Sequence, residues 1–204
     1  MKTTPFREIA AYMDRLHDDV GMLVKLVERL MGEEGYEALS RYGNRACWHL
    51  SSHWGYPDRW RAPYVTRVYV PNGQDTYASI AVFLVQFDPD SAYEFPPIIC
   101  ARYYHEGLSG AEVDGIFDTL RLRSLSRIEP DWTSFRQESG WMVAEPAFDA
   151  PIHYIKGYIL NLFDIIDQQH VVDNIILPLT RHDDNLDDLL TVKKHPFPAM
   201  QIEG

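Results

Sequence analysis

Residues 64–105 read YVTRVYVPNGQDTYASIAVFLVQFDPDSAYEFPPIICARYYH, and this stretch decides the fold class. Residues 64–70, 77–87 and 98–105 are three runs rich in the β-branched and aromatic residues that favour strands. The turn signals PNG and DPD lie between them, and a proline pair precedes the last run. The connections are too short for parallel crossovers, which need a dozen or more residues. The stretch therefore predicts a three-stranded antiparallel meander.

The chain before this meander has the pattern of a long amphipathic helix. Thr4-Pro5 indicates a helix start and Gly32 a stop. The apolar residues are alternately four and three positions apart: Ile9, Met13, Leu16, Val20, Leu23, Val27 and Leu30. β-Branched residues at heptad position a with leucine at d favour a two-stranded coiled coil, and hence a homodimer. The residues then expected to contact a second copy are Leu16, Val20, Leu23 and Val27. Alternatively, the helix packs on its own domain, because further apolar residues widen the stripe.

More helices and one more strand are expected around the meander. A short helix is predicted over residues 33–42, and the capping box Ser109-Gly110-Ala111-Glu112 marks the start of another. Residues 137–145 are expected to add a fourth strand. Residues 150–167 are apolar on nearly all sides and are expected to form a buried helix, in which Gly157 lets a neighbour approach closely.

Together these elements predict a single α+β domain over residues 1–204. Its sheet is an antiparallel meander of about four strands, with helices packed on one face and a long N-terminal amphipathic helix. Three parts are distinguished: an N-terminal helical element (1–43), a sheet-and-helix core (64–170), and an acidic segment with an extended tail (171–204). Phe197, Met200 and Ile202 are spaced along that tail as anchors for docking on its own domain or on a partner.

Composition narrows the class of protein. The 204 residues include 19 basic and 30 acidic ones, for a formal net charge of −11. This argues against a polyanion-binding protein whose whole surface is the binding site. Two cysteines, Cys47 and Cys100, are few for a disulfide-dependent secreted protein, and the start lacks the apolar stretch of a signal peptide. The longest apolar run, 80–85, is far too short to span a bilayer. We therefore expect a cytoplasmic protein.

Charge is unevenly distributed along the chain. The stretch from Arg41 to Arg67, here called the arginine belt, has five arginines against one acid and is interleaved with tryptophan and tyrosine. Such residues dominate protein–protein hot spots, and they also suit anion or single-stranded nucleic-acid sites. Alternatively, the tryptophans are core residues and the arginines are solvated. The candidate interface residues are Arg45, Trp48, Trp54, Arg59, Trp60 and Arg61. Residues 164–190 form the opposite pole, with seven aspartates against Arg181.

Candidate catalytic and metal-ligating residues are few. His49 and His53 are four apart and would share one face of a helix, but the glutamate of the zinc-protease motif is missing. His105 and Glu106 could form an acid/base pair, although neighbours on a strand point apart. Residues 183–194 imitate the start of a calcium loop, but its glycine and final glutamate are replaced. No phosphate loop, nucleophile elbow or Cys-x-x-Cys pair occurs.

These patterns favour a non-enzymatic protein-interaction subunit or adaptor that self-associates through its N-terminal helix and acts in a larger assembly. One alternative is a hydrolase-like enzyme that binds a small molecule or metal, with His49, His53 and His105 near a pocket lined by His, Tyr and Trp. A third hypothesis is local binding of an anion or single-stranded nucleic acid by the arginine belt. No cofactor and no membrane partner are expected.

Overall fold

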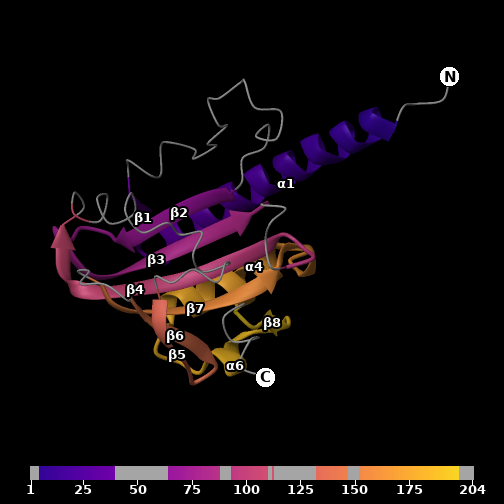
Figure 1. Ribbon diagram of the computed structural model, residues 1–204. Helices are drawn as coiled ribbons and strands as arrows, with labels where there is room; N and C mark the ends of the chain where they lie inside the picture. The colour runs from indigo at the N-terminus through magenta and orange to yellow at the C-terminus, as the bar shows by residue number, and fades with distance from the viewer. Residues whose placement is uncertain are drawn as a thin grey trace.

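The computed structural model describes residues 5–39, 64–87, 93–109, 112, 132–146 and 152–197. Within these residues an antiparallel sheet of eight strands forms one layer of the molecule (Figure 1). The strand order is β1-β2-β3-β4-β7-β6-β5, and β8 pairs with β7. The strands are β1 (Tyr36–Ala38), β2 (Tyr64–Pro71), β3 (Thr76–Gln86), β4 (Pro97–Ser109), β5 (Trp132–Glu138), β6 (Trp141–Pro146), β7 (Ile152–Asn161) and β8 (Lys194–His195).

Helices before and after the strands form the second layer. The first, α1 (Pro5–Glu33), has 29 residues. A single helical turn, η3 (Leu162–Asp164), leaves β7. It is followed by α4 (Gln168–Val171), the π-helical turn η4 (Val172–Ile176), α5 (Leu177–Thr180) and α6 (Leu186–Leu189). In the described part of the chain, no helix combines the length and the apolar character needed to cross a bilayer.

The two faces of the sheet carry two hydrophobic cores. The helix-side core joins α1 and the C-terminal helices to the sheet, and it includes Val20, Val24, Val27, Phe83, Cys100, Tyr158, Ile175 and Leu179. The opposite core includes Val82, Ile99, Tyr103, Ile155, Ile159 and Phe197. Each fully buried aliphatic or aromatic side chain contributes about 1.5–3 kcal/mol. Because the central strands are buried on both faces, they carry apolar residues at consecutive positions rather than at alternate ones.

Among the described side chains of α1, the buried ones lie in the second half of the helix. Buried residues begin at Val20 and continue through Val24, Val27, Leu30 and Met31 at helical spacing. None of the side chains described between residues 11 and 19 is buried. Figure 1 accordingly shows the N-terminal part of α1 extending past the edge of the sheet. The described side chains between residues 11 and 19 therefore gain little burial from the chain's own core.

The α+β class and the antiparallel meander are confirmed, since β2, β3 and β4 pair in sequence at the predicted positions. Three finer predictions are wrong. The sheet has eight strands instead of about four. The predicted fourth strand is a hairpin, because Ser139 and Gly140 both adopt positive φ and reverse the chain between β5 and β6. The predicted helix over residues 33–42 contains β1, which pairs with β2 after the turn at Gly35.

The predicted helix over residues 150–167 is the strand β7 followed by η3. Its run Ile152–Asn161 pairs with nearly the whole of β4, from Pro97 opposite Asn161 to His105 opposite Ile152. Strand β7 contributes Ile155 and Ile159 to the opposite core and Tyr158 to the helix-side core. A strand buried on both faces has the same unbroken apolar pattern as a buried helix, so periodicity cannot separate the two. Gly157 does allow close approach, because a Cβ there would lie 3.2 Å from the Cys100 carbonyl oxygen.

Candidate functional site

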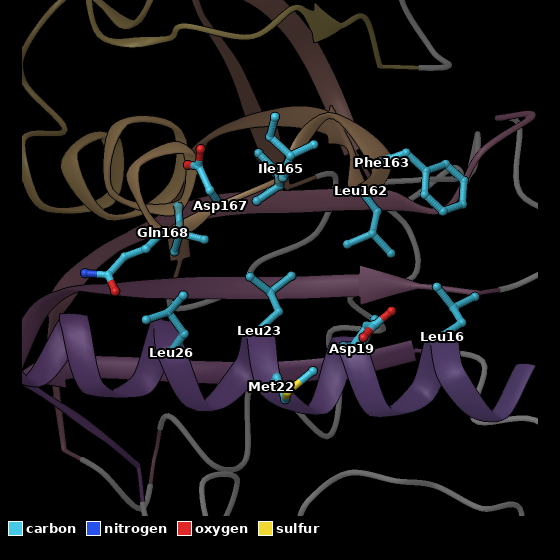
Figure 2. Close-up of a pocket in the computed structure, with 13 residues that line it drawn as sticks. Leu16, Asp19, Met22, Leu23, Leu26, Leu162, Phe163, Ile165, Asp167 and Gln168 are labelled. Atoms are coloured by element: carbon cyan, nitrogen blue, oxygen red, sulfur yellow. The ribbon is translucent and has the colours of Figure 1, made fainter.

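An apolar groove lies between α1 and the segment 162–171, which leaves the end of β7. It encloses about 370 Å³. Figure 2 shows Leu16, Leu23 and Leu26 pointing from α1 toward the facing wall. The lining residues are Leu16, Asp19, Val20, Met22, Leu23 and Leu26 on α1, and Leu162, Phe163, Ile165, Ile166, Asp167, Gln168 and Val171 on the facing wall.

Large apolar side chains at this groove are exposed to solvent. The exposed fractions are 62% for Met22, 52% for Phe163 and 74% for Ile166. The local backbone explains the second wall: Asn161 Oδ1 accepts a hydrogen bond from the Phe163 N–H at 3.1 Å and caps η3. The chain then runs extended through Ile165 until Asp167 caps α4. The link between η3 and α4 is a short stretch of chain, and it cannot bury the apolar side chains on both of its sides.

The groove has an acidic residue on each wall. Asp19 belongs to α1, and Asp167 lies on the facing wall (Figure 2). Asp167 Oδ1 accepts a hydrogen bond from the His170 N–H at 2.9 Å and lies 2.8 Å from His170 Nδ1. The backbone bond, with the side-chain bond second, lowers the pKa of Asp167 below its usual value. The carboxylate is therefore ionised at neutral pH.

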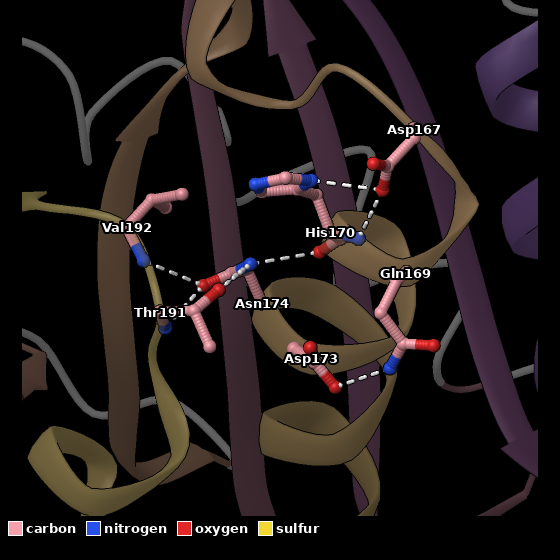
Figure 3. A network of polar contacts seen from close by, with 7 residues as sticks. All are labelled: Asp167, Gln169, His170, Asp173, Asn174, Thr191 and Val192. Atoms are coloured by element: carbon pink, nitrogen blue, oxygen red, sulfur yellow. Dashed lines mark hydrogen bonds and ion pairs between the residues drawn. The ribbon is translucent and has the colours of Figure 1, made fainter.

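The facing wall is anchored by a buried amide (Figure 3). Asn174, in the π-helical turn η4, donates to the His170 carbonyl at 2.9 Å and to Thr191 Oγ1 at 2.8 Å. Its Oδ1 accepts the N–H groups of Thr191 and Val192, at 2.7 and 3.0 Å. All the hydrogen-bonding capacity of the amide is used. Asn174 thus links two segments: the helical turns that follow the groove wall, and the chain at Thr191 and Val192 that leads into the tail.

A second polar cluster joins the C-terminal helices to the sheet. Arg102 is buried and donates to Ser79 Oγ and Tyr36 Oη at 3.0 Å each, and to the Leu179 carbonyl. On the same face of β4, Tyr104 Oη lies 2.8 Å from His182 Nδ1. Burial, and next the charge of Arg102, lowers the pKa of His182. The same ring nitrogen lies 3.1 Å from Asp183 Oδ1, so it contacts both the tyrosine hydroxyl and a carboxylate. This cluster fastens α5 and the following turn to β1, β3 and β4.

The residues of α1 that are expected to contact a second copy are divided between two surfaces. Leu16 and Leu23 are partly exposed and line the groove. Val20 is buried at the base of the groove, and Val27 is buried in the helix-side core. From Val20 onward, the valines of the heptad pattern therefore pack on the chain's own sheet.

Most of the arginine belt lies outside the described residues. This applies to the predicted interface residues Arg45, Trp48, Trp54, Arg59, Trp60 and Arg61, and to the metal candidates His49 and His53. Arg67 is described: it is buried on β2, and its Nε lies 3.7 Å from Glu28 Oε2 on α1. Cys47 is also outside, whereas the thiol of Cys100 is free and buried. Burial raises the pKa of Cys100 to about 12, which keeps it in the unreactive thiol form.

The catalytic candidates do not come together. His105 is buried, whereas Glu106 is exposed and its Oε1 lies 3.5 Å from His153 Nε2. In the calcium-like segment, Asn185 caps α6 and Asp187 pairs with Lys194. Within the described residues, no group of three or more His, Cys, Asp or Glu side chains is placed to hold a metal ion.

Phe163, Ile165 and Ile166 are among the groove residues that sequence analysis missed, because they lay in the segment predicted as a buried helix. Asn161 and Asp167 flank them, and both are residue types that cap helices. Two capping residues six positions apart in an apolar run indicate that one element ends and another begins. Comparison with known proteins finds no matching family model, curated protein or solved structure.

Proposed function

We propose that the protein is a non-enzymatic interaction subunit that binds another polypeptide in the groove between α1 and residues 162–171. One observation carries the proposal: the large apolar side chains that are exposed in the described part of the chain gather at this place. They are Tyr12, Met22, Phe163 and Ile166. Three of them line the groove or its rim, and Tyr12 lies one helical turn before Leu16 on α1. A contiguous exposed apolar surface of this kind is typical of an interaction site.

Further support comes from the packing of α1. The helix has 29 residues, and among its described side chains the buried ones begin at Val20. Tyr12 and Leu16, which lie before Val20 and are not buried, would gain burial if a partner covered them. The arrangement of His105 and Glu106 does not support the enzyme hypothesis, because Glu106 pairs with His153 instead of facing His105.

Self-association through α1 remains a prediction. Val20 and Val27 are buried within the chain, so of the four residues expected to contact a second copy, Leu16 and Leu23 are the ones that are not buried. A second copy and a different protein therefore compete for the same groove residues.

The double variant Phe163→Ser plus Ile166→Ser tests the proposed function. Both side chains are exposed, so the variant should fold with nearly unchanged stability, as circular dichroism and thermal unfolding would verify. We expect it to lose the proteins that co-purify with the wild type from native extract, quantified by mass spectrometry. The matched control, Asp75→Ser plus Thr76→Ser, changes two exposed residues at the β2–β3 turn. It should retain the co-purifying proteins. An identical set of partners for all three proteins would contradict the proposal.

A further inference from the structure

We infer that the occupant of the groove is an amphipathic helix that carries basic residues beside its apolar face. The inference rests on the proposed function and specifies the chemistry of the partner. The groove runs along α1 from Leu16 to Leu26, which is about 15 Å at the rise of an α-helix. This length matches about three helical turns of a partner with apolar anchors at i, i+3 or i+4, and i+7. Tyr12 continues the stripe by one more turn.

The backbone of α1 excludes strand addition as the binding mode on that wall. In a helix interior, N–H and C=O groups are already bonded within the helix, so α1 offers no open backbone edge between Leu16 and Leu26. Recognition at this wall must therefore use side chains, which here are mostly leucines. Leucines on a helix pack best against a second helix, whose ridges fit between them.

The charged residues around the groove indicate which residues flank the apolar face of the partner helix. Asp19 and Asp167 line the groove from opposite walls. Of the eight charged residues of α1 between positions 11 and 33, five are acidic and three basic. Arg29 pairs with Glu33 and Glu28 lies near Arg67, which leaves three acidic and two basic residues outside these contacts. The facing wall, residues 162–171, contains two aspartates and no lysine or arginine. Lysine or arginine on both flanks of a partner helix would meet these carboxylates, and such complementarity sets specificity and association rate.

The same charges disfavour a second copy of the chain as the occupant. Two grooves facing each other across a twofold axis would bring the Asp19 and Asp167 carboxylates of both copies into one interface. Like charges placed together in an interface suppress association. A basic helix from another protein satisfies both the apolar and the acidic parts of the groove.

Two synthetic 21-residue peptides test the inference with the full-length chain. Both carry leucine at the same helical positions, and the other positions are lysine in one peptide and glutamate in the other. By fluorescence anisotropy at 0.15 M salt, we expect the Leu/Lys peptide to bind at least tenfold more tightly than the Leu/Glu peptide. Phe163→Ser plus Ile166→Ser should weaken Leu/Lys binding at least tenfold.

A matched pair of charge variants separates the groove from general acidity. Asp19→Asn plus Asp167→Asn removes the lining carboxylates, and asparagine preserves the cap of α4. We expect it to weaken Leu/Lys binding about fivefold. Asp75→Asn plus Asp188→Asn makes the same charge change at exposed positions away from both walls of the groove, and screening at this salt concentration should limit its effect to less than twofold.

The outcomes distinguish this inference from the proposed function. Equal binding of the two peptides, or equal effects of the two aspartate pairs, overturns the basic-helix inference. The proposed function survives that result if Phe163→Ser plus Ile166→Ser still loses its cellular partners. If analytical ultracentrifugation finds a wild-type dimer that this apolar variant dissociates, a second copy fills the groove and the inference is overturned. If neither peptides nor cellular partners respond to the apolar variant, both proposals fail.

Discussion

His105 is buried at an irregularity near the end of β4. Its Nδ1 accepts a hydrogen bond from the Leu108 N–H at 3.2 Å, across a bulge in the β3–β4 pairing where Gly107 has a φ of +67°. Only a neutral imidazole can accept this bond. Burial, and next the nearby His153, lowers the pKa of His105 to about 4, against a weaker opposing effect of Glu112. His105, a catalytic candidate from the sequence, thus accepts the Leu108 N–H at this bulge.

This environment predicts a loss of stability in mild acid. Because the pKa of His105 is lower in the folded chain than in the unfolded one, the unfolded state alone binds the proton between about pH 6.5 and pH 4. Folding stability should fall as the pH falls through that window, by about 2–3 kcal/mol from this group, and the loss should be complete below pH 4. Urea unfolding at a series of pH values measures it.

The comparison for this experiment is His105→Asn. The Oδ1 of asparagine has the position of Nδ1 and can accept the Leu108 N–H, but it does not titrate, so the stability of this variant should depend less on pH between 7 and 4 than that of the wild type. The carboxylates that titrate in the same window are common to both proteins and cancel in the difference. Parallel pH profiles would show that His105 does not contribute.

At the scale of elements, the β5–β6 hairpin is held against the C-terminal segment. Ser139 and Gly140 have φ of 48° and 79°, the left-handed pair of a tight two-residue turn. The Ser139 carbonyl accepts the Leu186 N–H at 2.9 Å, and Trp141 Nε1 donates to the Asp184 carbonyl at 3.0 Å. The aspartate-rich segment therefore packs on this hairpin and is not simply solvated.

Gly140→Ala should disrupt this contact. A Cβ at Gly140 would lie 2.9 Å from the backbone nitrogen and the carboxyl group of Asp187, and φ is positive there. We expect a loss of about 2–4 kcal/mol in the free energy of unfolding, from left-handed strain and the clash together. Chemical denaturation measures this loss.

Gly73→Ala provides the control for backbone strain alone. Gly73 has a φ of +72°, but nothing lies within 4 Å of the Cβ position. Its substitution should cost only about 1–2 kcal/mol, the usual penalty of the left-handed conformation. Equal losses for the two glycine variants would mean that the approach of Asp187 does not matter.

The elements also show how far sequence patterns reach. Turn signals and β-branched runs predicted the three meander strands, because those signals act locally. The run Ile152–Asn161 was misassigned, since a strand covered on both faces loses its alternation. Sequence patterns identified residues on one wall of the groove, because the spacing of Leu16 and Leu23 predicted them as contact residues on the N-terminal helix. The other wall depended on where β7 ends, and that position depends on its pairing with β4.

At the scale of the whole molecule, the tail links the two faces of the sheet. On the helix side, Asn174 accepts the N–H groups of Thr191 and Val192. The chain then pairs with β7 through β8, and Tyr93 Oη donates to the Pro196 carbonyl at 2.7 Å. It ends, in the described part, with Phe197 in the opposite core, where a Cβ at Gly157 would lie 3.5 Å from its ring. Gly157 of β7 thus leaves room for an anchor that comes from the tail.

Replacing Phe197 or Phe163 with alanine distinguishes a residue that stabilises the fold from a residue of the binding surface. Phe197 is 2% exposed and Phe163 is 52% exposed. Phe197→Ala should lower the free energy of unfolding by about 3–5 kcal/mol, because it leaves a cavity above Gly157. Phe163→Ala should change it by less than about 0.5 kcal/mol and weaken partner binding instead. Urea unfolding and peptide anisotropy on both variants measure the two effects. Similar stability losses would contradict this division, since they would mean that both phenylalanines anchor the fold.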